Sequence, residues 1–175
     1  MSYKYTSGSV RRGDLYYEDD RVGSPTYIDF GYDTIALRPS GSAILYAEDD
    51  AVGIGTTTPN STLTVNGSLQ FKVGQLSGNA TLDDTDHVAS VDCNSGNVVV
   101  TLPSVSEEMA GRVYIIKRAD TGPSGGGNSL IIARNGANID GAATNLSGIA
   151  NGTSHTLICV GGAGWIVISK YTGGS

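Results

Sequence analysis

The side chains able to support catalysis or bind a metal ion are few and scattered in this sequence. His87 and His155 each begin a strand-like stretch, and neither has a partner at a fixed spacing. A nucleophile needs a neighbouring base and a metal site needs several ligands, so we expect no catalytic residue and no bound metal. A site shared by three copies of one histidine around a threefold axis stays open as an alternative.

Two acidic runs and one glycine pair also lack the spacing of a known site. Glu18-Asp19-Asp20 and Glu48-Asp49-Asp50 supply oxygen atoms that suit calcium, but neither run sits in an ordered ligand loop. We therefore interpret both runs as solvated turns. Gly53-Ile54-Gly55 lacks the third glycine and the following helix of a dinucleotide-binding motif. The sequence thus predicts a protein without a cofactor and without enzymatic activity.

The charge and hydropathy of the chain exclude two classes of partner. The 175 residues carry a formal net charge of −6, with 11 Lys and Arg side chains against 17 Asp and Glu. Nucleic-acid binding needs clustered basic groups, which this composition does not provide. No stretch approaches the roughly 20 apolar residues of a membrane span, and no signal-like apolar run follows Met1. We expect a protein made in a cytoplasm that leaves it, if at all, by a route such as cell lysis.

The composition favours an all-β fold with many tight turns. Glycine is abundant at 25 residues, and glycine and asparagine supply the positive φ angles that such turns need. The only helix-like segment is 104–110, which has room for one or two turns. Cys93 and Cys159 both lie in strand-like runs, where we expect buried free thiols.

The first region, residues 1–66, holds short strands that cannot enclose a core alone. Expected strands are 27–30, 34–38, 43–47 and 52–55, and the stretch 16–23 recurs in similar form at 46–53. A few short hairpins with so few large apolar side chains do not offset their conformational entropy in water. We therefore predict that these hairpins intertwine with those of other copies.

The second region, residues 67–175, has the strand pattern of a β-sandwich. Expected strands are His87–Cys93, Asn97–Leu102, Arg112–Ala119, Ser129–Arg134, His155–Val160 and Trp165–Tyr171. Their number and spacing suggest a jelly-roll-like knob. Trp165 sits in a strongly apolar strand, so we expect it in the core. The segments 121–129 and 142–151 are expected loops.

One segment resembles a known family. Residues 52–71 read VGIGTTTPNSTLTVNGSLQF, and the pattern VGIGTTxPxxxLxVxGxLxF is similar to a motif of tailed-bacteriophage fibre and virion structural proteins, particularly those of cyanophages and other marine phages. The segment 27–38 and the patterns 98–103, 111–117 and 165–167 also look like parts of such proteins. The resemblance implies a homotrimer with a docked N-terminal region and a distal C-terminal knob.

The motif predicts which residues meet between subunits. Gly53 and Gly55 would let backbones approach closely at a threefold axis, and Pro59 would end the pairing. The side chains that we expect in a buried strip between subunits are Val52, Ile54, Leu63, Val65, Leu69 and Phe71. The candidate anchors for docking onto other virion proteins are Tyr3, Tyr5, Arg11 and Arg12, because Tyr and Arg are favoured at interface hot spots.

Three functions follow as hypotheses. The first is a short fibre-like appendage of the tail, neck or head, assembled in the host cytoplasm and carried on the virion, whose knob faces a host surface glycan or protein. The second is a capsid decoration protein that stabilises the phage head. The third is a carbohydrate-binding receptor tip, which would need an exposed aromatic platform.

Overall fold

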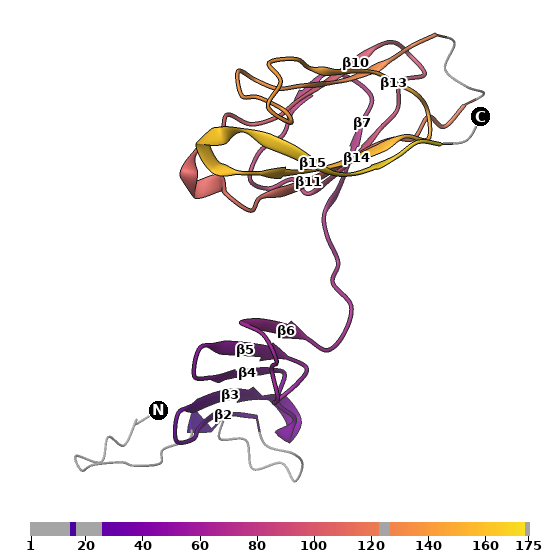
Figure 1. Ribbon diagram of the computed structural model, residues 1–175. Coiled ribbons are helices and arrows are strands. Elements are labelled where there is room, and N and C mark those ends of the chain that lie inside the picture. Colours follow the sequence, from indigo (N-terminus) through magenta and orange to yellow (C-terminus); the bar gives the residue numbers. More distant parts are fainter. Residues whose placement is uncertain (1–14, 17–25, 123–126, 174–175) are drawn as a thin grey trace, which may run out of the picture. The chain divides into compact units, whose positions relative to one another are not determined.

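The computed structural model describes residues 15–16, 26–122 and 127–173, and it divides the chain into two compact units. Unit 1 is Met1–Gln70 and unit 2 is Phe71–Ser175. Each unit is built from short strands (Figure 1), and the described helices are three single 3-10 turns. The predicted all-β class is confirmed. No described helix has the length and apolarity needed to cross a membrane.

Unit 1 is a single six-stranded sheet in the order β1-β2-β3-β4-β5-β6. Neighbouring strands are antiparallel from β1 to β5, and β6 runs parallel to β5. A short 3-10 turn, η1 (Pro39–Gly41), lies between β3 and β4. The strands are β1 (Leu15–Tyr16), β2 (Tyr27–Phe30), β3 (Thr34–Arg38), β4 (Leu45–Glu48), β5 (Ala51–Ile54) and β6 (Leu63–Val65).

Tight turns fix the register of this sheet. Asp33 and Asp49 adopt left-handed φ angles of 60° and 49° in the turns before β3 and before β5, a conformation that Asp tolerates better than most residues. The repeated segment 46–53 therefore forms the β4–β5 hairpin. Most of its earlier counterpart, 16–23, lies outside the described residues.

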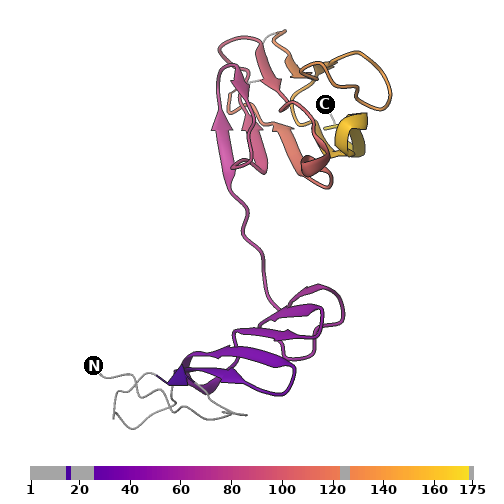
Figure 2. The same ribbon diagram turned by 90° about the vertical axis from the view of Figure 1, so that its left-hand side faces the viewer.

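Unit 2 consists of two facing sheets that share one core (Figures 1 and 2). One sheet has the order β13-β12-β10-β8 and the other β15-β14-β11-β9-β7. The 3-10 turns are η2 (Glu107–Met109) and η3 (Gly161–Ala163). The strands are β7 (Val73–Leu76), β8 (Ala80–Thr81), β9 (Val88–Val91), β10 (Val98–Thr101), β11 (Val113–Arg118), β12 (Leu130–Ala133), β13 (Leu146–Ile149), β14 (Ser154–Cys159) and β15 (Trp165–Tyr171).

The connectivity of unit 2 differs from the predicted jelly roll. From β7 to β12 the chain alternates between the two sheets, and each of β7, β8, β9 and β10 pairs in parallel with the strand two positions on. A jelly roll is made of antiparallel Greek keys. Here three coils stack on one another, and antiparallel strands β13, β14 and β15 complete the two sheets. The prediction of a two-sheet unit agrees with this arrangement, whereas the jelly-roll connectivity does not.

Asparagine side chains link successive coils at equivalent turns. The Oδ1 atom of Asn79 accepts a hydrogen bond from the Val99 amide at 2.8 Å, and Asn97 Oδ1 accepts one from the Ser129 amide at 2.8 Å. Asn79 and Asn97 both directly precede a strand of the four-stranded sheet. These side chains satisfy backbone amides at the point where each coil meets the next.

The core lies between the two sheets and consists of sixteen buried residues. Trp165 is 1% exposed and lies beside Tyr114, with ring centroids 5.5 Å apart, so its predicted place in the core is confirmed. Cys93 and Cys159 are buried free thiols, as predicted. Among the expected loops, 142–151 contains strand β13.

Candidate subunit interface

The strand register of unit 1 divides its sheet into an apolar and a polar face. Successive residues of a strand point to opposite sides, so residues paired across strands share a face. One row of paired residues is Ile28, Leu37, Leu45, Ile54 and Val65. A second row on the same face is Phe30, Ile35, Ala47, Val52 and Leu63. These ten side chains, all of them hydrocarbon, define the apolar face.

The apolar face is open in the single chain. Five of its ten side chains are exposed, from 36% for Leu37 to 58% for Leu63, and the other five are half-buried. The described part of unit 1 contains no second layer that could cover them. A sheet with one apolar face is stable only when that face packs against another layer.

The opposite face is polar and satisfied within the chain. Arg38 and Asp29 form an ion pair with a 2.8 Å distance between Nε and Oδ2. The Tyr46 hydroxyl donates a hydrogen bond to Glu48 at 3.2 Å, and partial burial together with the Glu48 charge raises the pKa of Tyr46. Alternating polar and apolar residues along each strand thus give the sheet one polar face and one apolar face.

The glycines of the VGIGTT segment serve contacts inside the chain. A Cβ atom on Gly53 would lie 2.4 Å from the Thr56 carbonyl oxygen, and one on Gly55, whose φ is +70°, would lie 2.9 Å from the Asn66 carbonyl oxygen. Gly53 also lies on the polar face of the sheet, whereas its neighbour Ile54 lies on the apolar face. Folding of the β5–β6 connection therefore already requires these glycines within one chain, and their expected role at a threefold axis stays a prediction.

Four of the six predicted interface residues lie together on the apolar face. Val52, Ile54, Leu63 and Val65 occupy adjoining positions on β5 and β6. Leu69 lies beyond β6 outside any strand, and Phe71 belongs to unit 2, where its ring stacks on His87 with centroids 4.1 Å apart. The candidate docking residues Tyr3, Tyr5, Arg11 and Arg12 lie outside the described residues.

Sequence reasoning missed the other six side chains of the apolar face: Ile28, Phe30, Ile35, Leu37, Leu45 and Ala47. The signal for them was the alternation of apolar and polar residues in 27–30, 34–38 and 45–48. That alternation indicates one buried face for each strand. Register then decides whether these faces coincide, and register depends on turn geometry.

The residues considered for chemistry do not converge. His155 is 4% exposed inside unit 2, and its Nδ1 atom has no hydrogen-bond partner in the described structure. A buried imidazole cannot reach a metal ion shared with another copy. In the described ranges, no three His, Cys, Asp or Glu side chains lie close enough to hold a metal ion.

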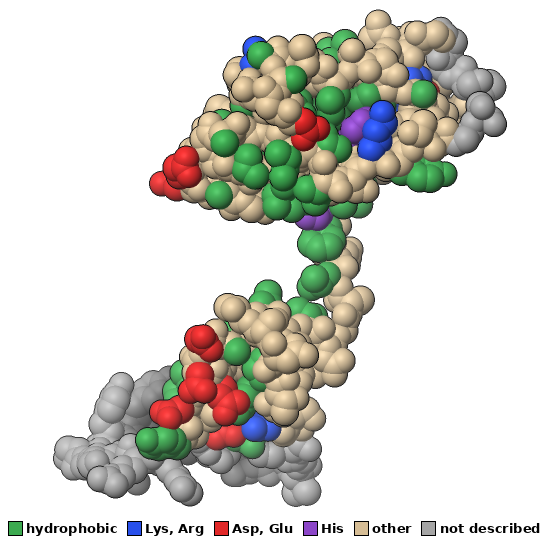
Figure 3. All heavy atoms as spheres, viewed as in Figure 1, with side chains coloured by type: hydrophobic (Ala, Val, Ile, Leu, Met, Phe, Trp, Pro, Cys, Tyr) green, Lys and Arg blue, Asp and Glu red, His purple; other side chains and the backbone are tan. Residues whose placement is uncertain are grey.

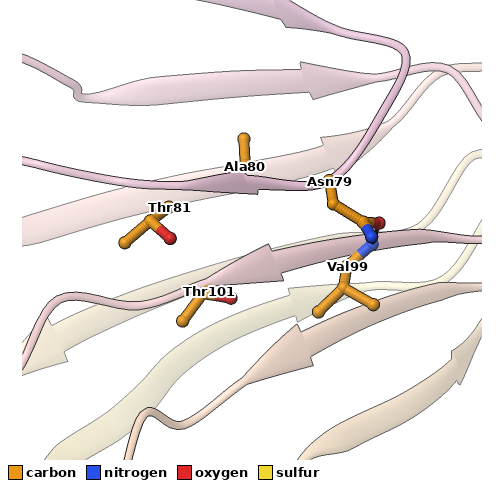
Figure 4. A pocket seen from close by; sticks show the side chains of 5 residues that line it. All are labelled: Asn79, Ala80, Thr81, Val99 and Thr101. Atoms are coloured by element: carbon orange, nitrogen blue, oxygen red, sulfur yellow. Dashed lines mark hydrogen bonds between the residues drawn. The ribbon is translucent and has the colours of Figure 1, made fainter.

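The hollows on the surface differ in their chemistry: one in unit 1 is lined in part by Asp33, Glu48 and Asp49. Another lies on the outer side of the four-stranded sheet (Figure 4), between Asn79, Thr81, Val99 and Thr101. It contains hydroxyl and amide groups but no titratable side chain. With Trp165 buried, the aromatic platform expected of a carbohydrate-binding tip lacks its main candidate.

Comparison with known proteins places no constraint on this arrangement, because no protein family and no curated protein matches the sequence.

Proposed function

We propose that this protein is a homotrimeric, non-enzymatic structural component of a tailed-phage particle, shaped as a short fibre-like appendage. The observation that carries the proposal is the open apolar face of unit 1, with ten hydrocarbon side chains on one side of a single-layer sheet. Such a face has the character of an obligate subunit interface, which resembles a protein core cut in half. The VGIGTT segment at the edge of this face supports the assignment to phage fibres.

Association would stabilise unit 1 strongly. Complete burial of a Val, Leu, Ile or Phe side chain contributes about 1.5–3 kcal/mol relative to exposure. Half of the apolar face is exposed and half is partly buried in the single chain, so covering it recovers a large share of that energy. Two sheets would close a sandwich and three a triangular bundle; the resemblance to trimeric phage fibres favours three.

The experiment that tests this proposal is the solution mass of the full chain by light scattering. A trimer has three times the chain mass of 18.0 kDa. Two substitutions at adjacent positions of β3 provide matched variants: Ile35→Lys places a charge on the apolar face, and Thr34→Lys places the same charge on the polar face beside Glu48.

We expect Ile35→Lys to give the mass of one chain and Thr34→Lys to keep the mass of the trimer. A wild-type chain that is monomeric at micromolar concentration would contradict the proposal. The capsid decoration alternative uses the same interface, and counting copies per particle separates it from a fibre, since a decoration protein follows the copy number of the major capsid protein.

A further inference from the structure

Unit 2 carries a second apolar surface on the outer side of its five-stranded sheet. Register places Val113, Ile158 and Ile166 in one outward-facing row and Val73, Val88 and Ile115 in the next. The second row continues with Thr156 and Ser169. The six apolar side chains Val73, Val88, Val113, Ile115, Ile158 and Ile166 define the outer-sheet patch.

The outer-sheet patch is exposed and uncharged. Val73 and Ile166 are 52% and 38% exposed, and the other four side chains are half-buried. Figure 3 shows hydrophobic side chains gathered on this side of unit 2. Lys117, in the next row, binds the Gly152 carbonyl oxygen and lies over the Tyr171 ring. A charge-depleted centre with polar groups at its rim is the composition of an interface.

The other outer face of unit 2 shows that the fold does not require this character. On the four-stranded sheet the outward positions are mixed: Thr81 pairs with Thr101, Val99 pairs with Ile131, and Asn79 lies at the edge of the same surface (Figure 4). Both faces are formed by outward positions of stacked coils. The five-stranded sheet differs in carrying two adjoining rows of three apolar side chains each on its outer face.

The size of the patch indicates its occupant. A stable free-standing interface uses about 20–30 residues from each partner, several times more than the patch provides. A partner that is already tethered needs far less, because linkage gives an effective concentration of about millimolar. The patch also lacks the charge that would make identical surfaces repel one another.

We propose that the outer-sheet patch packs against unit 2 of a second copy of this chain, in a contact that forms only while unit 1 holds the copies together. This inference rests on the proposed self-association of unit 1. It assigns the second interface to a surface of the knob and leaves the threonine-bearing face of the four-stranded sheet toward solvent.

Thiol labelling of the full chain tests this inference. Ile166→Cys places a reactive thiol in the outer-sheet patch, and Thr81→Cys places one at an exposed position on the opposite face. The native thiols of Cys93 and Cys159 are buried and serve as an unreactive background. Both variants are labelled with a maleimide, in the wild-type background and in the Ile35→Lys background.

We expect the Ile166→Cys variant to react about tenfold more slowly in the associated protein than in the Ile35→Lys background, since a contact with a Kd of about 0.1 mM is about 90% occupied at millimolar effective concentration. The Thr81→Cys variant should react at the same rate in both backgrounds.

Equal rates for Ile166→Cys in the two backgrounds, with the trimer mass retained in the first, would overturn this inference and leave the proposed function standing. Slow labelling in both backgrounds would also overturn it, because the patch would then be covered within its own chain. Failure of the proposed function is seen separately, as a single-chain mass of the unsubstituted protein.

Discussion

The two units use short strands in opposite ways. In unit 2, sixteen buried residues fill the space between two sheets, so the unit contains both of the layers that it needs. In unit 1, Ala36 is the one buried apolar side chain among the described residues, and the apolar face is open. An amphipathic sheet needs a second layer. Unit 2 supplies that layer itself, and in the proposed assembly unit 1 obtains it from other copies. Stability should therefore depend on protein concentration in unit 1 far more than in unit 2.

The largest expected effect follows from separating the copies. In the proposed assembly, dissociation by dilution or by Ile35→Lys removes the layer that covers the apolar face, so unit 1 should unfold while unit 2 stays folded. Hydrogen exchange measures both units in one sample. Amides of β2 to β5 should lose their protection and those of β9, β11 and β14 should keep it. Protected β3 amides in a monomeric chain would contradict the comparison.

A substitution in the core of unit 2 should destabilise unit 2 rather than unit 1. Tyr114 is fully buried in unit 2, and its hydroxyl donates a hydrogen bond to the Asp83 carbonyl oxygen at 2.6 Å. Tyr114→Ala should lower the free energy of unfolding of unit 2 by about 3–5 kcal/mol, and Tyr114→Phe by about 1 kcal/mol through loss of the hydrogen bond. Trp165 is the only tryptophan, so its fluorescence during denaturant unfolding reports on unit 2 alone.

The matched control for Tyr114 is Tyr32 in unit 1, which is almost fully exposed. Tyr32→Ala should change the unfolding of unit 2 by less than about 0.5 kcal/mol. An equal effect of the two alanine substitutions would mean that the two units are not independent in their stability.

The next effect compares two ion pairs. In unit 2, Arg118 and Asp120 are buried with 4% and 0% side-chain exposure, and Nη2 lies 2.7 Å from Oδ2. Asp120 also accepts a hydrogen bond from the Cys93 amide, and Arg118 donates to the Ile149 carbonyl, so the pair joins both sheets. Removal of one buried partner leaves an uncompensated charge, and Asp120→Asn should cost about 3 kcal/mol. Asp29→Asn in the more exposed pair with Arg38 of unit 1 should cost at most about 1 kcal/mol.

The buried pair also predicts a response to acid. The hydrogen bond from Arg118 holds the pKa of Asp120 below its ordinary value. The stability that this group adds is therefore present above the ordinary Asp pKa of about 3.9 and is lost as the pH falls through the lower value of the folded state. Below about pH 4, the free energy of unfolding of unit 2, measured with urea, should fall less steeply with pH in Asp120→Asn than in the wild type. Parallel pH profiles would show that Asp120 is not the group responsible.

Local sequence patterns predicted most of the strands but not how they pair. The six strands predicted in unit 2 are all present, as β9, β10, β11, β12, β14 and β15, because long runs of β-branched residues mark them. Strands β7, β8 and β13 were missed; they are short and carry glycine or polar residues. The parallel coils were missed because their pairs join residues that are distant in the sequence.

A weak signal of those coils was present. Gly-Asn occurs at 78–79, 96–97 and 127–128, each time shortly before a strand of the four-stranded sheet. The spacing is irregular, since the connections between coils differ in length, and a search for a fixed period does not find it. In unit 1 the alternation predicted β2 to β5 but neither β1 nor β6. Only the strand register shows that ten side chains from β2 to β6 share one face.

The repeated turns provide a smaller test. Asn97 Oδ1 accepts a hydrogen bond from the Ser129 amide. Asn97→Ala removes this acceptor and should lower the free energy of unfolding of unit 2 by about 1 kcal/mol, measured by denaturant unfolding. Asn97→Asp keeps an acceptor oxygen at the same place and should retain most of the stability. If both variants lose the same amount, the asparagine does not link the coils through this bond.

The smallest expected effect is a pH dependence specific to unit 2. Burial, followed by the charge of Lys170, lowers the pKa of His155 in the folded protein. The unfolded chain then binds a proton at a higher pH than the folded chain, so stability is complete above the ordinary His pKa of about 6.5 and is lost as the pH falls from there toward the folded-state value. The described part of unit 1 has no histidine. Acidification from pH 7.5 to 5.5 should thus lower the free energy of unfolding of unit 2, which Trp165 fluorescence follows in urea. The mass of the proposed trimer should stay unchanged. His155→Leu removes the titrating group and should flatten the profile; a slope that persists in this variant would assign the effect to another group.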